Sequence, residues 1–281
     1  PLIPGHEVVG RIEAIAADVS GWSVGQRVGV GFLGGHCGRC EPCRRGDFVN
    51  CRDQPFTGMT RDGGYAEMMT ARMTGLVAIP DGFDAIDAAP LLCAGITTFN
   101  ALRRSQARAG ELVAIHGIGG LGHLGVQYAR RMGFRVAAIS RGEDKRALAT
   151  KLGAHHYIDS DRENAAAALQ ALGGAKAILA TVSSPSAMSP LVDGLAPHGE
   201  LLVAGAGQEP LSVSTLGLIF GERSVRGTMV GTSIETEDML GFSLLQKISA
   251  MIETFPLEEG QRGFDRMMRN EARFRVVLTM D

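Results

Sequence analysis

The spacing of hydrophobic and polar residues changes along this chain and predicts two kinds of structure. Up to about residue 95, short β-type runs at 8–9, 27–30 and 66–69 alternate with glycine-containing loops. That pattern is typical of a domain built from short strands. From residue 94 to about residue 108 the apolar positions follow a helical period instead.

In the middle region, strands alternate with helices. Residues 112–115 form a continuous apolar run, as expected of a buried parallel strand, and a glycine-rich turn and a helical stretch to residue 132 follow. A second strand is expected at 135–139 and a helix at 144–152, with further apolar runs at 177–182, 201–204 and 225–230. This alternation predicts an α/β fold whose doubly wound parallel sheet is covered on both faces.

Beyond about residue 236 the pattern changes once more. It predicts a helix over 239–255, a short helix near 263–268 and a β-type run at 274–278 that closes the chain. No internal repeat or low-complexity stretch interrupts the sequence.

Composition narrows the class of protein. The 281 residues carry a formal net charge of -2, with acidic and basic residues interspersed. The sequence has neither the basic stripe of a nucleic-acid binder nor the roughly 18 uninterrupted apolar residues of a membrane helix. With no signal peptide visible, we expect a cytoplasmic protein. Because the chain opens on Pro1 inside what reads as an ordered segment, we also expect residues before it in the natural protein.

Four of the five cysteines lie within residues 37–51, at Cys37, Cys40, Cys43 and Cys51. Zinc binds four thiolates in a tetrahedron with Zn–S distances of about 2.3 Å, which closely spaced cysteines in one loop can provide. Disulfides fit poorly with a chain that lacks a secretion signal, and the spacing differs from that of ferredoxin iron–sulfur clusters. We therefore predict a closed, structural zinc site.

A glycine-rich loop joins the strand at 112–115 to the next helix. The sequence Gly117-Ile118-Gly119-Gly120-Leu121-Gly122 has the G-x-G-x-x-G spacing of dinucleotide-binding loops. In that motif the first glycine permits a tight turn, the second lets the backbone approach a pyrophosphate, and the third packs helix against strand. A turn without a ligand is the alternative, but the flanking strand and helix favour a loop that binds a dinucleotide cofactor.

The end of the second strand bears on which nicotinamide cofactor is bound. NAD-binding domains usually place an acidic residue there, whereas this chain has Ser140-Arg141-Gly142. A carboxylate would repel the 2′-phosphate of NADP, while Ser140 and Arg141 can accept it, and Lys145 can assist. The sequence therefore favours NADP over NAD, although both arginine and lysine are also common at solvated positions.

Two further segments contain candidate metal ligands. His6 and Glu7 stand side by side in Gly-His-Glu-Val-Val-Gly, and Cys93 precedes Ala-Gly-Ile-Thr-Thr. Taken alone, His6 can equally be a hydrogen-bonded core histidine and Cys93 a small buried hydrophobe.

Taken together and in their order, these motifs resemble the zinc-containing medium-chain alcohol dehydrogenases. The Gly-His-Glu motif, the cysteine loop, the Cys-Ala-Gly-Ile-Thr-Thr stretch, the glycine loop and the chain end Arg-Phe-Arg-Val-Val-Leu all carry the resemblance. It is greatest to bacterial enzymes of the propanol-preferring and cinnamyl alcohol types.

The resemblance implies a GroES-like catalytic domain split around a Rossmann domain. It predicts a first catalytic part over 1–95, a cofactor domain over 96–235 and a return to the catalytic domain over 236–281. It further implies that His6 and Cys93 hold a catalytic zinc, with Glu7 adjacent and Thr97 near the nicotinamide. The family's first zinc cysteine, and the hydroxyl residue beside it, would belong to a segment preceding Pro1.

The implied activity is hydride transfer between a primary alcohol or aldehyde and NAD(P), in a homodimer or homotetramer that pairs near residues 225–230. A zinc-free relative of the quinone reductases, or a catalytically impaired fragment that binds zinc and cofactor, are the alternatives. The remaining histidines have no matching role and are expected to be structural or exposed: His36, His116, His123, His155, His156 and His198.

Overall fold

The computed structural model of the protein describes residues 1–280. The chain forms two compact units. The first contains Pro1–Ile96 and Val230–Asp281, and the second contains Thr97–Met229. Helix α3, Ala94–Arg103, includes residues of both units. The first unit is therefore assembled from the two ends of the sequence, with the second unit inserted between them.

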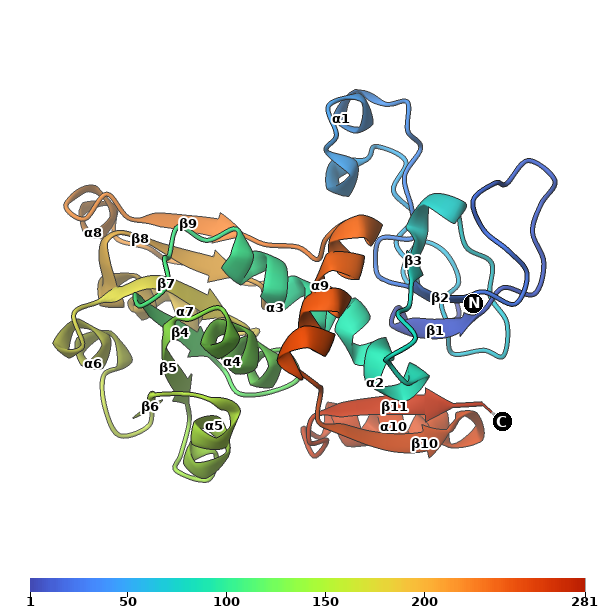
Figure 1. The fold of residues 1–281 in the computed structure, drawn as a ribbon. Coiled ribbons are helices and arrows are strands. Elements are labelled where there is room, and N and C mark those ends of the chain that lie inside the picture. Colours follow the sequence, from blue (N-terminus) through green and yellow to red (C-terminus); the bar gives the residue numbers. More distant parts are fainter. Residues whose placement is uncertain (281) are drawn as a thin grey trace. The chain divides into compact units, whose positions relative to one another are not determined.

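The second unit is built on a six-stranded parallel sheet in the order β6-β5-β4-β7-β8-β9 (Figure 1). Its strands are β4 Leu112–His116, β5 Arg135–Ser140, β6 His156–Asp159, β7 Ala175–Ala180, β8 Leu195–Val203 and β9 Ser224–Gly227. Its helices are α4 Gly122–Arg131, α5 Arg146–Leu152, α6 Ala165–Ala171, α7 Pro185–Met188 and α8 Thr215–Ile219. This is the predicted doubly wound α/β fold.

Both faces of this sheet are covered. Every residue of β4 is buried, which explains its uninterrupted apolar sequence. On one face Gly125 of α4 packs against Ile115, and on the other Ala114 belongs to a core cluster with Leu169 of α6 and Leu191. Because neighbouring residues of a strand point to opposite faces, the two contacts show that the helices form a layer on each side.

The first unit contains two small sheets. Strands β1 Val8–Arg11, β2 Arg27–Val30 and β3 Leu76–Ala78 pair antiparallel in that order. Strands β10 Ile252–Pro256 and β11 Arg275–Thr279 pair in parallel, although they lie next to each other in the sequence order of strands. Helix α10, Gly260–Met268, connects them. Short helices α1 Glu41–Arg44 and α2 Ala85–Ala88 complete this unit with α9, Ser233–Gln246.

The helix expected over 239–255 is wrong at both ends. A capping box fixes its start, since the side chain of Thr232 accepts from the N–H of Glu235 and the Glu235 carboxylate accepts from the N–H of Thr232. The helix ends where Lys247 adopts a left-handed conformation, with φ of 54°. Residues 252–256 then form β10, because their backbone pairs with β11.

The strand expected at 66–69 does not form. Gly63 and Gly64 turn the chain against the N-terminal segment, and their N–H groups donate to the carbonyls of Ile3 and Gly5. A Cβ on Gly63 would lie 2.0 Å from the oxygen of Gly5, so only glycine permits this approach. Within the part of the chain that the structure describes, residues 66–69 belong to no sheet.

In residues 1–280 no single helix is long and apolar enough to cross a membrane, and the bent pair Ala85–Leu92 and Ala94–Arg103 passes that test only when taken together.

Candidate metal and cofactor sites

The four clustered cysteines converge in the first unit. Their sulfur atoms all lie within 4.8 Å of one another, and those of Cys40 and Cys51 are 3.9 Å apart. A tetrahedral zinc site with Zn–S bonds of about 2.3 Å needs sulfurs about 3.8 Å apart, so the arrangement fits this metal. Cys43 and Cys51 are buried, which shields the site from water on one side.

Local structure places these cysteines. Cys40 precedes α1, Pro42 near the start of α1 favours the helical turn, and Cys43 lies within it. Cys51 follows the 3₁₀ turn Phe48–Asn50, which folds the chain back towards Cys37. The N–H of Cys37 then donates to the Cys51 sulfur at 3.3 Å. A tight loop of two turns is therefore sufficient to collect all four thiols.

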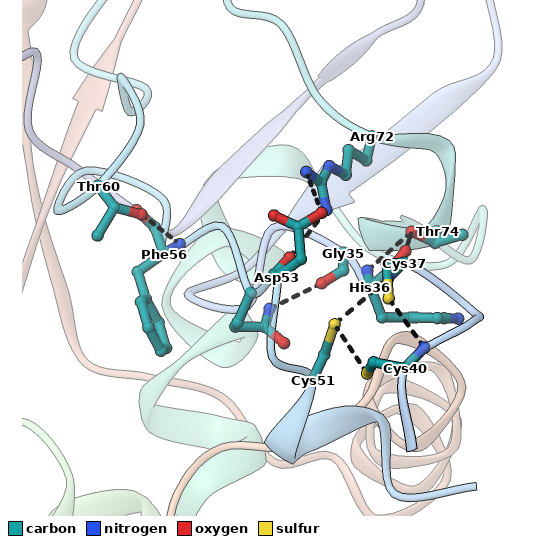
Figure 2. A network of polar contacts seen from close by, with 11 residues as sticks. Gly35, His36, Cys37, Cys40, Cys51, Asp53, Phe56, Thr60, Arg72 and Thr74 are labelled. Atoms are coloured by element: carbon teal, nitrogen blue, oxygen red, sulfur yellow. Dashed lines mark hydrogen bonds and ion pairs between the residues drawn. The ribbon is translucent and has the colours of Figure 1, made fainter. Parts of the chain in front are cut away.

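Polar contacts on both sides of the cysteine loop hold it in place (Figure 2). The Thr74 hydroxyl accepts from the N–H of His36 at 2.9 Å and donates to the His36 carbonyl at 3.0 Å. Arg72 donates to the backbone carbonyl and the carboxylate of Asp53. These contacts join the loop to residues 72–74, far along the sequence, so the geometry of the thiols does not depend on the loop alone.

The thiols differ in acidity. Backbone N–H groups of Arg39 and Cys40 donate to the Cys37 thiolate and lower its pKa to about 6. Burial, together with hydrogen bonds that the Cys43 thiol donates to neighbouring sulfurs, raises the pKa of Cys43 to about 12. Since metal ligation requires thiolates, a bound cation would have to draw the proton from Cys43 in particular.

A second cluster forms around His6 and Cys93, which are 87 residues apart in sequence. The Nε2 atom of His6 lies 3.3 Å from the sulfur of Cys93. Two ligands of one tetrahedral zinc at Zn–N and Zn–S distances of about 2.05 and 2.3 Å would be separated by about 3.6 Å, so this pair also fits zinc. Burial lowers the pKa of His6, which favours the neutral imidazole that binds metals.

Glu7 is held beside this pair by two contacts. The N–H of Ala94 donates to its Oε1 at 3.2 Å, and Arg275 of β11 forms an ion pair with its Oε2. Both charged side chains are mostly buried. Sequence reasoning overlooked Arg275, and the available signal was a basic residue inside an otherwise apolar run at 274–278. The contact joins the C-terminal strand to the segment that contains His6.

Thr97 lies on α3, one helical turn after Cys93, and it is buried.

In the second unit, the glycine loop has the geometry that its motif predicts. Gly117 has φ of 92°, and a Cβ on Gly122 would lie 1.6 Å from the Gly117 carbonyl oxygen. A Cβ on Gly119 would meet nothing within 4 Å, so the backbone faces open space there. The first and third glycines are thus required by the fold, and the second leaves room for a ligand.

At the end of β5, Ser140 is buried and Arg141 is exposed. Gly142 turns the chain with φ of 72°, and its N–H donates to the Asp159 carboxylate of β6 at 2.8 Å. Lys145 immediately precedes α5. Ser140, Arg141 and Lys145 therefore lie in or next to one turn. The buried carboxylate of Asp159 holds this turn in place.

The other histidines occupy varied positions. His36 stacks on Phe48, His116 ends β4, His123 is fully buried on α4, His155 accepts from the N–H of Val136, His156 begins β6, and His198 pairs with Glu222 at the surface.

Two family models match the chain. The one described as alcohol dehydrogenase GroES-like domain covers residues 1–81, and the one described as zinc-binding dehydrogenase covers residues 120–244. An alcohol dehydrogenase of an Aspergillus species, notN, is 44% identical over 100% of this chain and 83% of its own length.

Solved structures of alcohol dehydrogenases are also similar to this chain. The cinnamyl alcohol dehydrogenase SbCAD4 of Sorghum bicolor is 31% identical with a TM-score of 0.89, covering 99% of this chain and 81% of its own. The protein named CAD of Helicobacter pylori, solved with NADP(H), is 27% identical with a TM-score of 0.85, covering 99% of this chain and 82% of its own. The chain therefore belongs to the zinc-dependent medium-chain alcohol dehydrogenases, which interconvert alcohols and aldehydes with NAD(P) as the hydride carrier.

Proposed function

We propose that this protein oxidises primary alcohols and reduces the corresponding aldehydes, with His6 and Cys93 as ligands of the catalytic zinc. The observation that carries the proposal is the 3.3 Å approach of His6 Nε2 to the Cys93 sulfur. A zinc ion bound there supplies Lewis-acid polarisation of the substrate oxygen, and the nicotinamide carries the hydride. Cys37, Cys40, Cys43 and Cys51 hold the structural zinc.

The protein's own groups position the reactants. His6 contributes a neutral imidazole, since burial lowers its pKa. Arg275 and the N–H of Ala94 fix the Glu7 carboxylate beside His6. We assign Thr97 a contact with the nicotinamide, and the backbone of Gly117, Gly119, Gly120, Leu121 and Gly122 contact with the cofactor pyrophosphate.

The test is to replace Cys93 by serine and to compare it with Cys43→Ser, which alters only the structural cluster. For Cys93→Ser we expect loss of alcohol oxidation, followed through the absorbance of the reduced cofactor, while cofactor binding is retained. For Cys43→Ser we expect a loss of stability at unchanged chemistry in the molecules that remain folded. Full turnover by Cys93→Ser, or reduction of activated double bonds in place of aldehydes, would overturn the proposal.

We also propose that NADP is preferred over NAD. The turn after β5 offers the Ser140 hydroxyl and the exposed Arg141 guanidinium, with Lys145 next to the turn, and a Helicobacter pylori relative has been solved with NADP(H). Arg141→Ala should raise the KM for NADP by about tenfold or more and leave the KM for NAD nearly unchanged, because a charged hydrogen bond to the 2′-phosphate is lost. A wild-type preference for NAD contradicts this assignment.

For the assembly we propose a homodimer or homotetramer that pairs through β9. This strand forms an edge of the six-stranded sheet, and Val225 in its centre is 37% exposed. Sedimentation of Val225→Lys should yield a smaller species than the wild type.

We place the enzyme in the cytoplasm, where a reducing environment preserves its cysteine thiols.

A further inference from the structure

We infer that His123 is a positioning residue for cofactor binding, which holds the Gly119–Gly120 peptide so that its N–H faces the pyrophosphate. The inference rests on the proposed assignment of the glycine loop to the cofactor. It concerns a side chain outside the G-x-G-x-x-G motif, in the first turn of α4.

His123 contacts one carbonyl twice. Its Nδ1 lies 2.8 Å from the Gly119 oxygen, and its backbone N–H donates to the same oxygen at 3.1 Å. A carbonyl oxygen only accepts hydrogen bonds, so Nδ1 must carry the hydrogen. The side chain of a helical residue leans towards the helix N-terminus, which is why the ring of His123 reaches back to a residue four positions earlier.

These contacts fix the orientation of a peptide plane. In a trans peptide, the C=O of one residue and the N–H of the next point in opposite directions. With the Gly119 carbonyl turned towards His123, the N–H of Gly120 points away from it. The N–H groups of Gly119, Gly120 and Leu121 donate to no acceptor within residues 1–280. They are therefore available to an anion at the start of the helix.

The imidazole adds a second hydrogen bond at a residue that has no side chain to anchor it. Gly119 has no Cβ, and a Cβ there would meet nothing within 4 Å, so the Gly119 carbonyl is where this part of the loop can be held. His123 is fully buried, and its ring cannot move without disturbing the surrounding core. A rigid donor thus holds a flexible peptide in the orientation that binds phosphate, which avoids part of the entropy cost of ordering it on binding.

The experiment compares cofactor binding by His123→Leu, His123→Asn and the wild type, measured by calorimetry with NADP and NAD. The asparagine amide nitrogen occupies the position of Nδ1 and retains the donor, whereas leucine removes it. We expect the Kd of the preferred dinucleotide to rise about tenfold in His123→Leu and to stay close to the wild type in His123→Asn. The Kd of adenosine 2′-monophosphate, which has no pyrophosphate, should change in neither variant.

Leu124→Val is the matched control, because Leu124 is equally buried on α4 and its side chain has no donor for the Gly119 carbonyl. It should lower thermal stability without changing the Kd of the dinucleotide. If His123→Leu does not fold, His123→Met replaces it, since the methionine side chain also has no hydrogen-bond donor. Equal affinity of the donor and non-donor variants for the dinucleotide overturns this inference. A wild type that binds neither dinucleotide overturns the proposed function instead.

Discussion

The ion pair between Glu7 and Arg275 should be among the most important single contacts for the stability of the first unit. The pair joins the segment before β1 to β11, and the two side chains retain only 17% and 24% of their exposure. Removing one partner leaves an uncompensated charge in a poorly solvated place. For fully buried pairs that costs about 3–5 kcal/mol, and the remaining exposure reduces our expectation for Arg275→Met to about 2–4 kcal/mol.

A double-mutant cycle separates the free energy of the Glu7–Arg275 interaction from the effect of changing either side chain alone. Glu7→Gln alone should also be destabilising, because it leaves Arg275 without its partner. In the double variant neither charge remains, and the Nε of Arg275, a buried donor with no acceptor among residues 1–280, is removed as well. The two single effects should therefore exceed the effect of the double variant by about 2 kcal/mol.

The assay is urea unfolding of the four proteins, monitored by circular dichroism. The control is Arg262→Met, which breaks the ion pair with Glu259 in the same unit. Those side chains are 73% and 44% exposed, and we expect a change below about 1 kcal/mol. Additivity within about 0.5 kcal/mol in the Glu7–Arg275 cycle would show that the pair does not stabilise the fold as argued here.

Three further predictions concern other sites. Cys43→Ser should release about one zinc per chain, measured by metal analysis of the purified protein; unchanged zinc content would contradict the assignment of the cluster. Burial lowers the pKa of His116 from 6.5 to about 4, so the unfolded chain binds more protons between these values and stability should fall by about 3 kcal/mol as pH drops from 6.5 to 4. His116→Leu should remove that part of the pH dependence in unfolding curves recorded across this range, and an unaltered slope would refute the attribution. Gly122→Ala should prevent cofactor binding in a titration, because its Cβ would lie 1.6 Å from the Gly117 oxygen; binding at wild-type affinity would mean that the loop relaxes freely.

Local sequence determined the parts of this protein whose partners are close in the chain. The continuous apolar run before Gly117 predicted a buried strand, and the three spaced glycines predicted the turn and the helix behind it. Cysteine spacing alone predicted the zinc cluster, since four thiols within one loop need only two short turns to converge. Each of these features depends on backbone preferences and on distances over a few residues.

Tertiary structure decided the features that depend on distant partners. Residues 252–256 form a strand because β11 pairs with them, and residues 66–69 form none because Gly63 and Gly64 bring the chain against residues 3–5 instead. Strands β3 and β6 are so short that a hydrophobic period is barely present in them.

The same division applies to the sites. The motifs selected His6, Glu7 and Cys93 through a family resemblance, but only the folded chain brought His6 and Cys93 within 3.3 Å and placed Arg275 on Glu7. The sequence pattern gave no indication of the role that we infer for His123, because a buried histidine has no periodic signature. Periodicity records which side of an element faces the core, whereas a contact between residues 87 or 268 apart depends on how the whole chain closes.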